Sequence, residues 1–202
     1  MTAHKNPIKL SGIRNITISG RIGTGKTTLA KHLADILGWS VLDGGKIFRK
    51  LSYEKGHHIK DTYKRPDSFD IAYEERIKKL LKEEENHIIE SHLAGFDAQG
   101  IGGVYKILVI CRNEDGKDKT SVRIDRLMNR ENISVKEAKE EVIEREKQNL
   151  EKFRRLYAKN NPDWVYWDDK YYDLIVNTYS LNQKEALDFV LKHINFKSRF
   201  SS

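Results

Sequence analysis

Short apolar runs alternate with longer amphipathic stretches along the chain. The runs are rich in Ile, Val and Leu, and several are almost continuously apolar. Such runs are typical of strands that are buried on both faces of a parallel sheet. We predict five strands, over Asn15–Ser19, Ser40–Asp43, His87–Ser91, Tyr105–Arg112 and Asp173–Thr178.

The stretches between these runs have helical periodicity. The helices predicted from it cover Thr27–Leu37, Lys46–Lys55, Asp67–Glu85, Thr120–Arg130, Ser134–Ala158 and Gln183–Ile194. The longest begins with Ser134 and has Glu137 three residues later, a pattern typical of a capping box. Strands that alternate with helices predict right-handed βαβ units. The expected fold class is therefore α/β, with three layers and a five-stranded parallel sheet flanked by helices.

Length and composition favour one domain. The chain has 202 residues, and its single cysteine, Cys111, excludes an internal disulfide. No apolar run approaches the roughly 18 residues of a membrane span. We expect a cytoplasmic protein without a membrane partner, built from one domain over 14–195 with tails at 1–13 and 196–202.

Positive charge is concentrated in the first third of the chain. The formal net charge is +7, and residues 1–66 hold 13 Lys and Arg against four Asp and Glu. This excess is compatible with a nucleic-acid surface, with a phosphate-handling half or with solvated lysines. Charge alone does not choose between these alternatives.

A glycine-rich segment between the first strand and the first helix favours the phosphate-handling alternative. It reads Gly20-Arg-Ile-Gly-Thr-Gly-Lys-Thr27 and fits the pattern G-x-x-x-x-G-K-[ST]. The glycines let backbone N–H groups surround a phosphate, and the helix N-terminus adds positive potential. Lys26 supplies a charge for the β- and γ-phosphates, and Thr27 supplies a hydroxyl ligand for Mg²⁺. The residues expected to bind ATP are Gly20, Gly23, Thr24, Gly25, Lys26 and Thr27.

Several arginines are candidates for contacts with the other reacting groups. Arg49 follows the second strand, and its guanidinium suits a terminal phosphate, although a surface arginine is the alternative. Arg126 and Arg130 lie four residues apart and share a helical face. Together with Arg145 and Arg154 they predict a helical lid over the phosphates; a solvated charged helix is the alternative for each. The lid region covers about residues 113–160.

At this point the chain resembles the P-loop nucleoside monophosphate kinases, and most closely the archaeal-type cytidylate kinases. The segments that carry the resemblance lie at 16–38, 42–56, 88–96, 123–131 and 172–178. The resemblance implies a P-loop NTPase fold and transfer of the γ-phosphate of ATP to a nucleoside monophosphate. CMP or dCMP is the favoured acceptor. The implied cofactors are ATP and Mg²⁺.

The resemblance also implies roles for single residues. Arg49 would meet the acceptor's phosphate, and Arg130 would reach the phosphate in transfer. Arg145 and Arg154 would be further lid cations. The additional ATP contacts would be made by Thr28, Arg126, Asn177 and Thr178.

Four further positions bear on the acceptor and the metal. His92 stands where the family has an arginine that contacts the acceptor, which predicts a weaker contact or an altered substrate. Lys46 replaces an acidic residue that is frequent in relatives. Glu90 either holds a metal-bound water or pairs with a lysine, and Asp43 ends the second strand, where it could contact the acceptor or a metal-bound water.

Two other functions remain open from the sequence. One is a P-loop kinase for another nucleotide or for a metabolite hydroxyl, in which Asp43 or Glu90 would act as the base. The other is a nucleic-acid-associated regulatory ATPase, which the lid arginines disfavour. We expect a monomer that binds small nucleotides and not nucleic acid. The aromatic run Trp164–Trp167 is expected to pack, and His57-His58 to lie in an exposed loop.

Overall fold

A computed structural model of the chain describes residues 6–45, 47 and 66–196. The five strands in this part form one parallel sheet in the order β2-β3-β1-β4-β5. Their bounds are β1 (Asn15–Gly20), β2 (Ser40–Asp43), β3 (His87–Glu90), β4 (Val104–Ile110) and β5 (Leu174–Asn177). The predicted five-stranded parallel sheet is confirmed. Arg49, Lys46, the pair His57-His58 and nearly all of the helix predicted over Lys46–Lys55 lie outside the described residues.

The central strand β1 determines where chemistry can occur. It pairs with β3 on one side, with Ile18 opposite Glu90, and with β4 on the other. On the far side of β3, Asp43 of β2 also lies opposite Glu90. Because parallel strands end at the same edge of a sheet, these polar residues are gathered where β1 leads into the glycine-rich loop.

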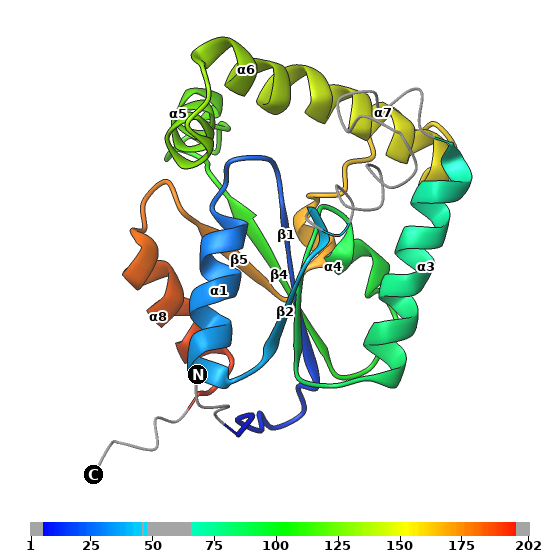
Figure 1. The fold of residues 1–202 in the computed structure, drawn as a ribbon, viewed down its shortest axis with the longest axis vertical. Coiled ribbons are helices and arrows are strands. Elements are labelled where there is room, and N and C mark those ends of the chain that lie inside the picture. The colour runs from blue at the N-terminus through cyan, green and yellow to red at the C-terminus, as the bar shows by residue number, and fades with distance from the viewer. Residues whose placement is uncertain (1–5, 46, 48–65, 197–202) are drawn as a thin grey trace.

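Helices cover both faces of the sheet (Figure 1). On one face lie α1 (Lys26–Leu37) and α8 (Gln183–His193), and on the other lie α3 (Asp67–Glu83) and α4 (Ala94–Asp97). One apolar core includes Ile16, Ile18 and Leu33, and a second joins Ile77 to Ile89. The three predicted layers are thus confirmed, and burial of both sheet faces explains why the strands are so apolar.

A helical lid crosses the carboxyl end of the sheet (Figure 1). It consists of α5 (Thr120–Glu131), α6 (Val135–Lys139), the π-helical turn η2 (Glu140–Arg145) and α7 (Glu146–Tyr157). The capping box predicted at Ser134 is present: the Ser134 hydroxyl accepts from the Glu137 N–H, and the Glu137 carboxylate accepts from the Ser134 N–H. The helix predicted over Ser134–Ala158 contains a π-helical turn, η2, and is thus not a single α-helix.

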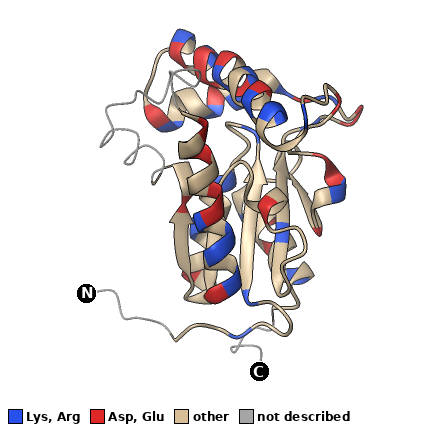
Figure 2. Ribbon diagram, turned by 90° about the vertical axis from the view of Figure 1, so that its right-hand side faces the viewer, with Lys and Arg blue, Asp and Glu red and all other residues tan. Residues whose placement is uncertain are grey.

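The underside of the lid is apolar. Ile124 and Leu127 of α5 are buried with Ile22 of the glycine-rich loop, together with Val142. The aromatic run also packs, as predicted: Trp164 and Tyr166 are buried in a cluster with Leu93 and Phe153. Along the lid and α3, cations and anions are interspersed (Figure 2). Within the described residues, no helix is long and apolar enough to cross a membrane.

Candidate active site

The loop between β1 and α1 has the backbone of a phosphate cradle. Gly20, Gly23 and Gly25 have φ values of 146°, 79° and 100°, which side chains disfavour. The Thr24 hydroxyl donates to the carbonyl of Arg21 at 2.9 Å and thereby closes the turn. The first turn of α1 follows directly, so its N–H groups face the same hollow. This arrangement suits a bound phosphate chain.

Gly23 tolerates no side chain for a second reason. A methyl group there would lie 2.9 Å from Cβ of Arg123 and closer still to the Arg123 carbonyl oxygen. We expect Gly23→Ala to lower the free energy of unfolding by more than the ~1–2 kcal/mol that left-handed backbone costs. Gly100→Ala is the control, because Gly100 has φ 74° and no atom within 4 Å of its added methyl. Equal losses in urea unfolding of the two variants would contradict this packing.

Lys26 lies at the centre of the site. Its side chain is buried, and Nζ donates to the Arg21 carbonyl at 2.9 Å. Nζ also lies 3.8 Å from Oε1 of Glu90. Burial lowers the pKa of the Lys26 ammonium, and the attraction of Glu90 opposes that effect. A buried cation with one nearby carboxylate is well placed to bind further negative charge.

Thr27 and Glu90 place two oxygen donors beside this lysine. The Thr27 hydroxyl donates to Oε2 of Glu90 at 3.2 Å. Hydroxyl and carboxylate oxygens are the ligands that small divalent cations prefer. Among the described residues, no group of three or more His, Cys, Asp or Glu could hold a metal. A metal at this place would therefore take most of its ligands from phosphate and water.

A cavity of about 440 Å³ lies beside the cradle, between α5 and the segment after β5. Arg126 donates to the Thr178 hydroxyl at 2.8 Å and to the Thr178 carbonyl at 2.7 Å. The Thr178 hydroxyl donates in turn to the Thr24 carbonyl at 2.7 Å. The predicted ATP-binding and lid residues that line this cavity are Gly23, Gly25, Thr28, Arg126, Arg130 and Thr178.

A second cavity, of about 80 Å³, is lined by Glu90, the carboxylate that lies 3.8 Å from Lys26. His92 lines it, with Nδ1 3.2 Å from the Gly20 carbonyl oxygen and 3.3 Å from the Tyr166 hydroxyl. Burial, together with the positive charge of Lys26 and Arg145, keeps the pKa of His92 well below its usual range. His92 is therefore neutral at pH 7. The remaining charged or amide side chains of the lining are Asp70, Glu74, Glu90, Arg145 and Asn149.

The comparisons with known proteins agree with this geometry. A family model described as an AAA domain matches residues 16–149. A cytidylate kinase of Methanocella arvoryzae is 31% identical over 183 residues, which cover 89% of this chain and 96% of the relative. One of Haloarcula marismortui is 32% identical over 179 residues, covering 87% of this chain and 86% of the relative. The chain belongs to the P-loop nucleoside monophosphate kinases.

Solved structures support the fold of this kinase. A shikimate kinase from Acinetobacter baumannii has a TM-score of 0.51 at 18% identity, covering 91% of this chain and 92% of that one. An uncharacterized protein from Eubacterium ventriosum has a TM-score of 0.61 at 17% identity and covers 91% of this chain and 99% of its own. At such identities the likeness concerns the P-loop kinase fold alone.

The other lid cations of the kinase are held in different ways. Arg130 is half-exposed and pairs with Glu131 at 2.9 Å, and its charge helps to lower the pKa of Lys26. Arg145 pairs with Glu141 and lines the second cavity. Arg154 instead donates to the Trp164 carbonyl at 2.9 Å. The structure thus brings the charge of Arg130 to bear on Lys26, places Arg145 at the second cavity with His92, and engages Arg154 with the aromatic run.

Asn177 of the kinase closes the end of the sheet. Its Oδ1 accepts from the Arg112 N–H at 3.1 Å, and its Nδ2 donates to the Arg112 carbonyl at 2.8 Å. These bonds tie the ends of β4 and β5 together. Thr178 lines the cavity beside the cradle and Asn177 is not among its lining residues, while the contact of both with adenine stays a prediction.

Two buried carboxyl groups stand behind the second cavity. Glu74 and Asp97 are 6% and 4% exposed, and Lys78 lies 3.5 Å from Asp97. Burial, the charge of Asp97 and a hydrogen bond with it raise the pKa of Glu74 well above 4.5. The pKa of Asp97 is also raised, mainly by burial. The folded kinase therefore retains a proton here that the unfolded chain releases.

This proton makes stability depend on pH. Since the folded state binds more protons than the unfolded state, the free energy of unfolding is highest below pH 4.5 as far as this pair is concerned, and it falls as the pH rises toward the raised pKa of Glu74. We expect Glu74→Gln to flatten that fall in urea unfolding measured from pH 5 to 8. Glu83→Gln, at an exposed position of the same helix, is the control. An unchanged slope in Glu74→Gln would contradict the shared proton.

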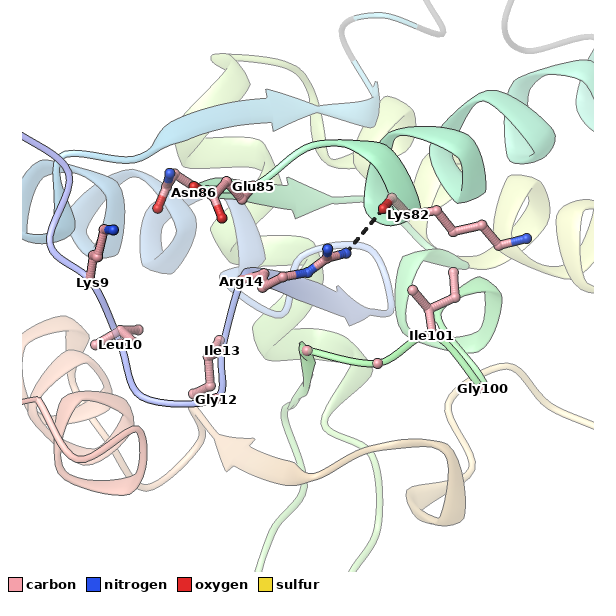
Figure 3. A pocket seen from close by; sticks show the side chains of 12 residues that line it. Lys9, Leu10, Gly12, Ile13, Arg14, Lys82, Glu85, Asn86, Gly100 and Ile101 are labelled. Carbon is pink, nitrogen blue, oxygen red and sulfur yellow. Dashed lines mark hydrogen bonds between the residues drawn. The ribbon is translucent and has the colours of Figure 1, made fainter.

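A wider cavity lies at the opposite end of the sheet (Figure 3). It has a volume of about 630 Å³, and Lys9, Arg14, Lys82 and Glu85 contribute its charged side chains. The Arg14 guanidinium donates to the carbonyls of Leu81 and Lys82 at 3.0 and 3.2 Å, so it fastens the end of α3. We assign this cavity no part in the kinase reaction.

Sequence reasoning missed the ion pairs between cradle and lid. Arg123 is fully buried and contacts both Asp118 and Glu146, and Arg21 contacts the same two carboxylates. The partners lie up to 125 positions apart in the chain. No local spacing could reveal them, and the only available signal was the surplus of charged residues in segments with an apolar face.

Proposed function

We propose that this kinase transfers the γ-phosphoryl group of Mg²⁺-bound ATP to CMP or dCMP. The observation that carries the proposal is that Lys26 adjoins residues of two cavities, since Gly25 precedes it in the chain and Glu90 lies 3.8 Å from its Nζ. One cavity is bordered by the cradle, Arg126 and Thr178, and the other by Glu90, His92 and Arg145. ATP in the first cavity and the phosphate end of an acceptor in the second would meet near Lys26. The named activity of the cytidylate kinase relatives supports the choice of acceptor.

The residues around Lys26 can perform this transfer without a general base. A monophosphate acceptor is already anionic, so catalysis requires positioning and neutralisation of charge. Lys26 and the cradle N–H groups would hold the β- and γ-phosphates, and Arg130 and Arg145 would approach from the lid. Thr27 would contribute a hydroxyl to Mg²⁺, and Glu90 would hold a metal-bound water. When bound, Mg²⁺ neutralises charge between the β- and γ-phosphates.

His92 favours a second candidate, a kinase for a hydroxyl group. A neutral imidazole offers less attraction to a phosphate than the arginine that the family resemblance leads one to expect. Two carboxylates, Asp70 and Glu90, line the same cavity, together with the carboxyl group of Glu74. A hydroxyl acceptor would need a base. The candidates are Glu90 and Asp43, which lies opposite Glu90 in the sheet.

A panel of acceptors separates the two functions. ADP release is measured with CMP, dCMP, UMP, AMP and GMP, and with sugars and hydroxy acids. We expect the highest kcat/KM with CMP or dCMP, by about 10²-fold over any hydroxyl acceptor. A sugar or hydroxy acid that is phosphorylated faster than each monophosphate would overturn the proposal in favour of the second candidate.

A further inference from the structure

Two lid residues hold the backbone of one cradle residue, Ile22. The Ile22 carbonyl accepts from Nη1 of Arg123, on α5, at 2.7 Å. The Ile22 N–H donates to Oε2 of Glu146, at the start of α7, at 3.1 Å. Arg123 and Glu146 also pair with each other at 3.0 Å. Both backbone polar groups of Ile22, its N–H and its carbonyl, are therefore held by lid residues, one from each arm of the lid.

The surroundings make this attachment rigid. Arg123 is 0% and Glu146 4% exposed, so water does not compete for their bonds. Asp118 accepts from Nε and Nη2 of Arg123 at 3.1 and 3.0 Å. Arg21 pairs with Asp118 at 3.2 Å and with Glu146, and its guanidinium stacks 4.6 Å from the centre of the Trp167 ring. Two cations and two anions thus form a neutral cluster, in which Arg123 and Glu146 are buried and Arg21 and Asp118 are partly exposed.

Ile22, whose backbone is held in this way, immediately precedes the phosphate-binding glycines Gly23 and Gly25. Ile22 is followed by Gly23, whose Cα faces the backbone of Arg123. Lys26 Nζ bonds the carbonyl of Arg21, the residue before Ile22. A shift of the backbone at Ile22 would move the cradle N–H groups together with the Arg21 carbonyl, to which Lys26 is bonded. It would also move them relative to Arg126 and Arg130, which lie on the same helix as Arg123.

We propose that Arg123 and Glu146 are positioning residues that set the phosphate cradle against the lid arginines. They hold the N–H and the carbonyl of Ile22, so that Lys26 and the lid cations contact the same phosphate. Neither residue is proposed to touch substrate. The proposal rests on phosphoryl transfer from ATP at this site and not on the identity of the acceptor.

The test separates positioning from mere stability. Arg123→Met leaves the cluster with one uncompensated negative charge, whereas Arg123→Met/Glu146→Met restores neutrality. We therefore expect the double variant to recover most of the thermal stability that the single variant loses. The kcat of the double variant should nevertheless stay about 10²-fold below that of the parent kinase, because the N–H and the carbonyl of Ile22 are no longer held by the lid. The KM of the acceptor should change by less than about twofold, because the acceptor site is left intact.

Two further variants complete the experiment. Glu146→Gln keeps the shape of the side chain but removes its charge, and it should lower kcat without lowering acceptor affinity. Glu144→Gln, at an exposed position of the π turn that precedes Glu146, should leave both constants unchanged. A stable double variant or Glu146→Gln variant with the parent's kcat would overturn the proposal, as would a loss confined to the acceptor's KM. A parent protein that phosphorylates no acceptor would instead refute the proposed function.

Discussion

Replacement of Lys26 by methionine is expected to lower kcat by about 10³-fold, or about 4 kcal/mol in the activation barrier. Lys26 is the buried cation beside the residues that border the two cavities. Its Nζ lies 3.8 Å from Glu90 and 2.9 Å from the Arg21 carbonyl. Methionine preserves most of the side-chain volume. The loss should therefore appear in turnover and not in folding.

Single-turnover kinetics with saturating Mg²⁺ and ATP measure this effect. Lys31→Met is the matched control, because Lys31 is exposed on the same helix, α1. Thermal unfolding of both variants shows whether either loses structure. If Lys26→Met retained more than a tenth of the parent's rate while Lys31→Met was unaffected, Lys26 would not be the cation that the reaction depends on.

Removal of the Arg130 guanidinium should be nearly as severe for the reaction. In enzymes where one arginine neutralises the transferring phosphate, that arginine is worth about 10³–10⁵ in rate. Arg130 is half-exposed at the rim of the cavity beside the cradle, and its charge already acts on Lys26. Arg130→Met should therefore lower kcat by at least about 10³-fold. ATP affinity should change much less, because the cradle holds the triphosphate independently.

Titration of a fluorescent ATP analogue, alongside kcat, separates these two quantities. Lys136→Met serves as the lid control, since Lys136 is exposed on α6 and lies six positions further along the chain. A variant at Arg130 that loses ATP binding and turnover in equal proportion would show that this arginine binds ground-state ATP. The role in the transition state would then be wrong.

The fold could be predicted from the sequence because its strands are buried on both faces. Ile16, Ile18, Ile88 and Ile107 are all fully buried, so isoleucines mark the strands, and β4 appears as an almost continuous apolar run. The ends were less accurate. The strand predicted to reach Arg112 stops at Ile110, because the Arg112 N–H bonds the side chain of Asn177 and not a neighbouring strand.

Local signals explain which parts of the site could be predicted. The cradle is contiguous in sequence, and Arg126 and Arg130 share a helical face by their spacing alone. The short helix α4 was missed, since four residues are too few to show a period. The π turn before Arg145 was missed as well, because its charged residues follow the same general pattern as an α-helix.

Contacts between distant residues could not be predicted in the same way. Arg123 stands 101 positions from its partner Ile22, and Arg126 stands 52 from Thr178. The same arginine-rich helix therefore supplies one side chain to the clamp on Ile22, one to the wall of the ATP-side cavity and one to the rim near Lys26. Only the folded chain separates these three roles.

The central claim is that two nucleotides meet end to end near Lys26. A single molecule tests it most directly: adenosine and cytidine joined through a chain of five phosphates, which spans both cavities at once. Isothermal titration with Mg²⁺ should give one site per chain, with an affinity at least about 10²-fold above that of ATP. Binding no tighter than that of ATP alone would contradict the account.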